Sequence, residues 1–263
     1  MSSLRSKDGT GIAYEQRGNG PALVVVDGAL ATRMGGSKEE LVELLSPNIS
    51  VYCYDRRGRG ESGDTPPYSV DREIEDIAAL IDEAGGVAFL YGHSSGGCLA
   101  LEAAGVLGTK VSKVALYEAP WNDDPEAQKA WGKYIERLTD ALGSGRRGDA
   151  VALFMEYTGM PAEQVNGMRH APFWSDLEAI APTLAYDHVA IMGRSGAVPA
   201  GRLSAVLIPT LVMCGGSSFP FMRATAQTIT QALPNGELRI LDGQTHDVQP
   251  AALAPSLTEF FLN

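Results

Sequence analysis

The sequence predicts an α/β protein with a mostly parallel twisted β-sheet that is flanked by helices on both faces. Short apolar runs typical of buried strands alternate with amphipathic helical segments across short connections. This alternation stops near Pro120 and resumes near residue 205. The length of 263 residues suits one large domain with an insertion. We therefore expect a core domain formed by residues 1–120 and 205–263, and a helical subdomain formed by residues 121–204.

The first half of the chain carries the clearest strand and helix patterns. Two extended segments open it at Leu4–Ser6 and Ile12–Gln16, with the hairpin-turn pair Asp8-Gly9 between them. The run Ala22–Val26 is apolar on both faces, which is typical of a central buried strand. The next expected strands and helices, in chain order, are Ser37–Leu45 (helix), Ile49–Tyr54 (strand), Val70–Ala84 (helix), Val87–Tyr91 (strand), Gly96–Leu107 (helix) and Val111–Tyr117 (strand).

After residue 120 the pattern is mainly helical, and then strands return. The expected helices of the insertion are Pro125–Leu142, Asp149–Tyr157, Pro161–His170, Trp174–Ile180 and Thr183–Ile191. The closing elements are the strand Thr210–Cys214, the helix Met222–Leu233, the strand Glu237–Leu241 and the helix Ala251–Phe261.

Charge and cysteine usage narrow the class of protein. Lys plus Arg total 21 and Asp plus Glu total 32, so the net charge is −11. Such an acidic chain repels nucleic acid and anionic membranes. Three cysteines without a CxxC pair argue against a disulfide framework or a zinc site. The first residues lack the apolar stretch of a secretory signal, so we expect a cytoplasmic protein, a monomer or homodimer, that acts on a small molecule.

One motif points to covalent chemistry. Residues 92–96 read Gly-His-Ser-Ser-Gly and lie between a predicted strand and a predicted helix. This is the context of a nucleophile elbow, a sharp turn that exposes Ser94 at its tip. Gly92 and Gly96 are small enough for the strand and the helix to approach each other. The N-terminus of the following helix favours negative charge that develops at the site.

With this motif the chain resembles the α/β-hydrolase superfamily over nearly its whole length. Residues 55–62 read Asp-Arg-Arg-Gly-Arg-Gly-Glu-Ser, which is similar to the D-x-R-G-x-G-x-S stretch of its capped esterase, epoxide-hydrolase and dehalogenase-like branch. The resemblance implies an α/β-hydrolase fold with a helical cap inserted after the sixth strand. In that branch a serine at the elbow implies ester or lactone chemistry, because the dehalogenases and epoxide hydrolases have an aspartate there.

A serine nucleophile needs a base, and the chain has four histidines. His246 lies in the loop between the last strand and the last helix, where the family has its base, so we assign it as general base. His93 is adjacent to Ser94, but alternation along the strand directs its side chain away, which favours a packing or hydrogen-bonding role. His170 and His188 belong to the insertion.

The triad acid departs from the commonest family pattern. The turn after the seventh predicted strand, residues 214–219, contains no carboxylate. The other family location is the end of the sixth strand, where this chain has Glu118. We therefore expect Glu118 to orient His246, as an acid at that position does in some dehalogenases and lactonases of this fold. Asp242 and Asp247 are the alternatives.

The resemblance also implies an oxyanion hole made of two backbone amides. One is the amide of Ser95, and the other is that of Ala29, with Leu30 as the alternative. Most relatives have His-Gly at this turn, whereas this chain has Asp27-Gly28. Some lactone hydrolases of the fold share the Asp-Gly pair, which weakly favours a lactone.

The leading hypothesis is a serine hydrolase that cleaves a carboxylic ester or lactone of a small, largely apolar molecule through an acyl-enzyme. Leu30, Trp121, Phe173 and Trp174 are the expected substrate-binding residues. Neither a metal nor an organic cofactor is implied. Two alternatives stay open: a non-catalytic, receptor-like protein that binds a small molecule, and a cofactor-free haloperoxidase or C–C hydrolase with the same machinery.

Overall fold

A computed structural model describes residues 2–33 and 37–263. In this part of the chain eight strands form one sheet in the order β1-β2-β4-β3-β5-β6-β7-β8. Strand β2 pairs antiparallel with β1 and β4, and every other pairing is parallel, so the predicted fold class is confirmed. The strands are β1 (Ser2–Arg5), β2 (Gly11–Arg17), β3 (Ala22–Val26), β4 (Ser50–Tyr54), β5 (Ala88–His93), β6 (Val111–Tyr117), β7 (Thr210–Gly215) and β8 (Gly236–Leu241).

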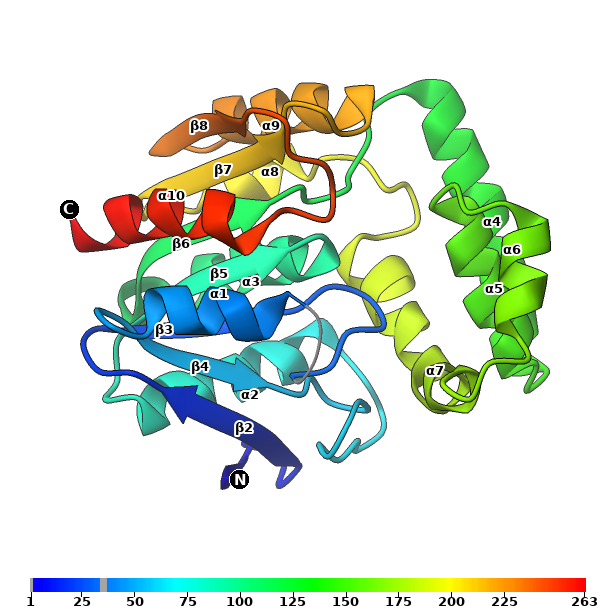
Figure 1. Cartoon of the computed structure of the whole chain (residues 1–263), viewed down its shortest axis with the longest axis horizontal. Coiled ribbons are helices and arrows are strands. Elements are labelled where there is room, and N and C mark those ends of the chain that lie inside the picture. Colours follow the sequence, from blue (N-terminus) through cyan, green and yellow to red (C-terminus); the bar gives the residue numbers. More distant parts are fainter. Residues whose placement is uncertain (1, 34–36) are drawn as a thin grey trace.

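Helices cover both faces of this sheet (Figure 1). Helices α1 (Lys38–Leu45) and α10 (Pro250–Leu262) pack together against one face. The other face carries α2 (Val70–Glu83), α3 (Ser95–Leu107) and α9 (Pro220–Ala232). Because both faces are covered, all five residues of β3 are buried, which explains its continuous apolar run. The short 3₁₀ turn η1 (Gly108–Lys110) joins α3 to β6.

The insertion between β6 and β7 is helical, as expected. Figure 1 shows α4 to α7 beside the sheet, at the end where the parallel strands terminate. The expected helix Thr183–Ile191 is wrong in detail: a 3₁₀ turn ends at Thr183, and a π-helical turn follows. The helical segments are α4 (Pro125–Gly143), α5 (Arg147–Tyr157), α6 (Ala162–Met168), α7 (Trp174–Ile180), η2 (Ala181–Thr183), η3 (Tyr186–Ile191) and α8 (Ala200–Leu203).

The insertion shares hydrophobic contacts with the sheet layers. Segment η3 packs against α2 and α3, and α8 packs against α3 and α9. One buried cluster contains side chains from β3, α3 and α4 together. All three cysteines are free and buried. Within residues 2–33 and 37–263, no helix combines the length and apolar character needed to cross a bilayer.

Candidate active site

The turn from β5 to α3 places Ser94 in a strained conformation. Its φ is +55° and its ψ is −130°, in the region that L side chains rarely adopt. The Ser94 amide donates a 2.9 Å hydrogen bond to the Tyr117 carbonyl in β6. A Cβ at Gly92 would lie 2.4 Å from the Gly96 carbonyl oxygen, and one at Gly96 would lie 2.1 Å from that of Val26. Glycine is therefore required on both sides of the serine.

Strain of this kind occurs on three turns. In the described residues, the non-glycine residues with positive φ are Leu30, Ser94 and Glu118, at +55°, +55° and +51°. Each follows the carboxyl end of a parallel strand, namely β3, β5 and β6. Such conformations cost about 1–3 kcal/mol each and tend to persist where surrounding structure and function hold them.

Gly28 brings the turn after β3 close to Ser94. An added Cβ at Gly28 would lie 3.0 Å from Ser94 Cβ and 3.1 Å from the His93 carbonyl oxygen. Ser95 is the first residue of α3, where helix N–H groups have no intrahelical acceptor. No acceptor for the N–H of Ala29 or of Ser95 occurs among the described residues. Two free amides therefore lie on the turns that flank Ser94.

Glu118 and His246 meet across 128 residues of sequence. The His246 Nδ1 lies 2.7 Å from Glu118 Oε2, and the Glu118 side chain has no exposed surface. The Gly215 amide donates to Oε1 at 2.8 Å, and the Ser218 hydroxyl donates to Oε2 at 2.9 Å. Burial raises the pKa of Glu118, but the hydrogen bonds from His246, Gly215 and Ser218 outweigh it and leave that pKa below its ordinary value.

The end of β7 and the turn that follows it therefore bind the Glu118 carboxylate, which their sequence did not reveal. This segment lacks a carboxylate of its own, but Gly215 and Ser218 donate to the carboxylate that β6 provides. The alternative acids, Asp242 and Asp247, are both exposed. The only hint in the sequence that Gly215 and Ser218 could donate hydrogen bonds to a carboxylate was that this segment is rich in small and hydroxylated residues.

The His93 side chain contacts the backbone of the loop that contains His246. Its Nε2 lies 3.0 Å from the His246 carbonyl oxygen, and the two imidazole rings are 4.8 Å apart. Burial, with His246 beside it, lowers the pKa of His93 to about 4. A neutral His93 donates its Nε2–H to that carbonyl, which agrees with the expected hydrogen-bonding role.

In the described residues no hydrogen bond joins the Ser94 hydroxyl to His246. Catalytic contacts often tighten only when substrate binds.

The Asp55–Ser62 stretch folds into a tight loop around its own carboxylate. Asp55 accepts hydrogen bonds from the amides of Arg33 and Glu61, and its carbonyl accepts one from the Ser62 hydroxyl. A Cβ at Gly60 would lie 2.3 Å from Asp55 Oδ2, so only glycine fits there. This loop directs three arginine side chains inward.

Two of these arginines form a buried ionic network that sequence reasoning missed. Arg56 pairs with Glu73 of α2 and with Asp187 of η3, and Arg59 pairs with the same Asp187. All four side chains are at most 1% exposed. The Ser95 hydroxyl also donates to Asp187, at 2.8 Å. The arginines of residues 55–62 and an aspartate in a mainly apolar helical stretch were the sequence signals for this network.

The expected substrate-binding residues differ in their exposure. Leu30 is partly buried and packs against two hydrophobic clusters. Trp121 has no exposed surface, and its Nε1 has no partner among the described residues. Trp174 is buried and donates to Glu178, whereas Phe173 is 45% exposed. Substrate contact by these four side chains stays a prediction.

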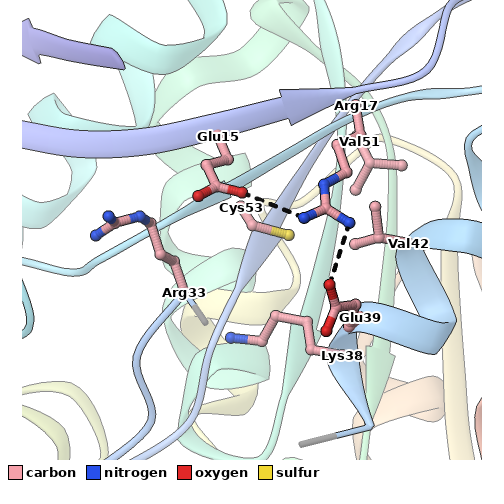
Figure 2. A pocket seen from close by; sticks show the side chains of 8 residues that line it. All are labelled: Glu15, Arg17, Arg33, Lys38, Glu39, Val42, Val51 and Cys53. Carbon is pink, nitrogen blue, oxygen red and sulfur yellow. Dashed lines mark hydrogen bonds and ion pairs between the residues drawn. The ribbon is translucent and has the colours of Figure 1, made fainter. Parts of the chain in front are cut away.

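A surface pocket elsewhere is too small for such a substrate. It lies between β2, β4 and α1 and has a volume of about 20 Å³, enough for a single water molecule. Figure 2 shows Arg17 paired with Glu15 and Glu39 beside Cys53. Burial raises the pKa of the Cys53 thiol to about 12, which favours the protonated thiol over the nucleophilic thiolate. In the described ranges no three histidine, cysteine, aspartate or glutamate side chains converge as metal ligands.

Comparison with known proteins shows the family of the chain. A family model described as "Alpha/beta hydrolase family" matches residues 32–255. The chain belongs to the alpha/beta hydrolase family. A solved alpha/beta hydrolase from Sphaerobacter thermophilus is 48% identical, with a TM-score of 0.85, and the match covers 99% of this chain and 100% of that one.

More distant relatives carry several hydrolase names. A protein of Agrobacterium fabrum, provisionally named as the carbamate hydrolase RutD, is 24% identical over 89% of this chain and 92% of its own length. The enol-lactonase of Burkholderia xenovorans shares the fold at 20% identity, with a TM-score of 0.69 and full coverage of both chains. These names span several hydrolytic reactions, so they do not select the bond that is cleaved.

Proposed function

We propose that this hydrolase is a serine hydrolase that cleaves a carboxylic ester or lactone through an acyl-enzyme. The contact between His246 Nδ1 and the buried Glu118 carboxylate carries the proposal. A carboxylate at Nδ1 holds the proton there and leaves Nε2 free to act as base. Ser94 is the nucleophile, at the tip of the β5–α3 turn.

Each residue then has a defined role in the reaction. His246 takes the Ser94 proton as Oγ attacks the carbonyl carbon, and the amides of Ala29 and Ser95 stabilise the resulting oxyanion. The tetrahedral intermediate collapses, and the alcohol leaves with the proton from His246. Water then attacks the acyl-enzyme with His246 again as base, which releases the acid and restores the Ser94 hydroxyl. Glu118 keeps the imidazole oriented throughout.

The proposed substrate class rests on the predicted binding residues and on the fold neighbours. Leu30, Trp121, Phe173 and Trp174 would provide an apolar binding surface under a cap formed by residues 121–204, which suits a small, largely apolar ester or lactone. The solved fold neighbours include the enol-lactonase already described and an esterase from Thermogutta terrifontis, which is 21% identical with a TM-score of 0.70 over 100% of this chain and 98% of that one. Those names match the two proposed bond types.

Active-site labelling tests the proposal without knowledge of the substrate. The purified protein is treated with a small fluorophosphonate, and the adduct is mapped by mass spectrometry. We expect rapid labelling of Ser94 that His246→Ala abolishes. His170→Ala is the matched control, because His170 is an exposed histidine of the insertion. A folded parent protein that is not labelled contradicts the proposal and favours the non-catalytic binding protein.

A further inference from the structure

Arg59 touches the turn that is expected to provide the Ala29 amide. Its side chain is 1% exposed, and its Nη1 donates a 2.6 Å hydrogen bond to the Gly28 carbonyl oxygen. The rest of the guanidinium is held by Asp187 and, at 3.2 Å from Nε, by the Thr183 hydroxyl. Both partners come from the insertion. Asp187 and Thr183 therefore hold the Arg59 guanidinium in place against the turn after β3.

The Gly28 carbonyl and the Ala29 N–H belong to one peptide unit. The peptide is planar and trans, since the cis bond in the described residues is Pro66–Pro67. In a trans peptide the C=O and the N–H point in opposite directions. A guanidinium that fixes the oxygen therefore fixes the direction of the N–H as well. A positive charge at the oxygen also polarises the amide and makes its N–H a stronger donor.

We propose that Arg59 is a positioning residue of the oxyanion hole, and that it orients and polarises the Ala29 amide through the Gly28 carbonyl. This inference rests on the proposed serine-hydrolase function. Arg59 does not touch the substrate. It determines how strongly one backbone donor stabilises the negative charge that develops at the carbonyl oxygen.

Asp187 connects this donor to the second one. Its carboxylate accepts from Arg59 and, at 2.8 Å, from the hydroxyl of Ser95, whose own amide is the other expected donor. Arg56 contacts the same carboxylate at 2.6 Å and the Asp27 carbonyl at 3.0 Å, one peptide before Gly28. Burial raises the pKa of Asp187, but Arg56 and Arg59 outweigh it and hold that pKa at about 2. One ionised side chain of η3 thus links both turns.

Arg57 provides an internal control for a purely structural role. It lies on the same loop, its side chain has no exposed surface, and it pairs with Asp76 and Asp8. It also donates to the Arg72 carbonyl. None of its contacts involves the Asp27–Leu30 turn. Arg57 and Arg59 therefore share chemistry, burial and loop, and they differ in whether they reach the turn.

The test compares Arg59→Lys with Arg57→Lys, using p-nitrophenyl acetate as the probe. Loss of one oxyanion donor lowers kcat by about 10²–10³-fold, so weakening one should lower kcat by about 10–100-fold. KM should change by less than about 3-fold, because the oxyanion exists only in the transition state. Arg57→Lys should keep kcat within about 3-fold of the parent even if its Tm falls equally.

A tetrahedral inhibitor provides a readout that a structural role would not change. The Ki of a trifluoromethyl ketone that adds to Ser94 should rise in Arg59→Lys by the same factor by which kcat/KM falls. Arg59→Gln, which also removes the charge, should lose more activity than Arg59→Lys. If both Arg59 variants fail to fold, Thr183→Val decides, since it keeps every charge and should lower kcat several-fold.

The possible failures are distinguishable. A parent protein in which Ser94 is not labelled by the fluorophosphonate overturns the proposed function, and the inference falls with it. Normal labelling of the parent, with equal kcat in Arg59→Lys and Arg57→Lys, overturns the inference alone. Unchanged kcat in Thr183→Val, where that variant has to decide, overturns it too.

Discussion

Two buried carboxylates lie near the β5–α3 turn that carries Ser94, and their partners differ in kind. Glu118 follows β6 and accepts from His246 Nδ1, while Asp187 lies in η3 and pairs with Arg56 and Arg59. Both side chains have no exposed surface, and both have a pKa below the ordinary value. Burial opposes ionisation in each, so each ionised carboxylate depends on its hydrogen bonds.

The difference lies in what the partner can do with a proton. An imidazole gains and loses a proton in the physiological pH range, whereas a guanidinium stays protonated. In the proposed mechanism Glu118 therefore stabilises a partner whose charge changes during the reaction. Asp187 joins groups of constant charge, which suits a group that holds turns in place. Substitutions at the two sites should separate activity from stability.

The largest effect is expected from Glu118→Gln. The amide keeps the volume but removes the charge that fixes the Nδ1 proton of His246, so kcat should fall about 10⁴-fold. Ester hydrolysis measured at neutral pH, with the fold checked by circular dichroism, provides the result. Asp242→Asn is the control, because Asp242 is an exposed carboxylate in the loop between β8 and α10 that contains His246. A folded Glu118→Gln protein with activity within a few-fold of the parent would contradict the role of Glu118.

Asp187→Asn should affect stability more than chemistry. Removing one charge from a buried ion pair costs about 3–5 kcal/mol, because Arg56 and Arg59 lose a shared counter-ion. The free energy of unfolding in urea measures this loss, and kcat should fall by about 10–100-fold as the oxyanion turns loosen. Equal losses of stability and activity in Asp187→Asn and Glu118→Gln would remove the distinction between the two carboxylates.

Sequence reasoning reached one of these carboxylates and missed the other. Glu118 ends a strand whose parallel neighbour carries the G-x-S-x-G turn, so topology alone brings it near Ser94. Asp187 reaches Arg59 across 128 residues through the packing of η3 on α3. Periodic patterns report which face of a helix is apolar. They do not report which buried charges meet across an insertion, nor that residues 186–191 form a π-helical turn.

Acid should reveal the contribution of the ionised Asp187 carboxylate to stability. The pKa of Asp187 is about 2 in the folded protein, whereas its ordinary value, which applies to the unfolded chain, is 3.8. This difference corresponds to about 2 kcal/mol of stability. This contribution is fully present above pH 4 and is lost as the pH falls toward 2. Urea unfolding between pH 5 and pH 2 should therefore show a shallower decline in Asp187→Asn than in the parent. Parallel declines would mean that Asp187 is not ionised in the folded protein.

The smallest expected effect concerns the turn after β7. Ser218→Ala removes one of three donors to Glu118 and leaves His246 and Gly215 in place. A single hydrogen bond to a charged group contributes about 1.5–3 kcal/mol, part of which the remaining donors recover, so kcat should fall by less than about 10-fold. Ser217→Ala is the matched control, since the Ser217 side chain is exposed. Equal activity of the two variants would mean that the Ser218 hydrogen bond does not contribute to catalysis, and that His246 and Gly215 are sufficient to hold Glu118.

Direct detection of the acyl-enzyme tests the central claim. The parent protein is mixed with p-nitrophenyl acetate, quenched in acid within the first turnover, and digested for mass spectrometry. We expect one acetyl group on the peptide that contains Ser94, formed with a burst of p-nitrophenol of about one equivalent. Glu118→Gln should form the same adduct far more slowly, and Asp187→Asn should form it at an intermediate rate. Turnover without any acetyl group on Ser94, or with the group on another residue, would contradict the assignment of Ser94 as nucleophile.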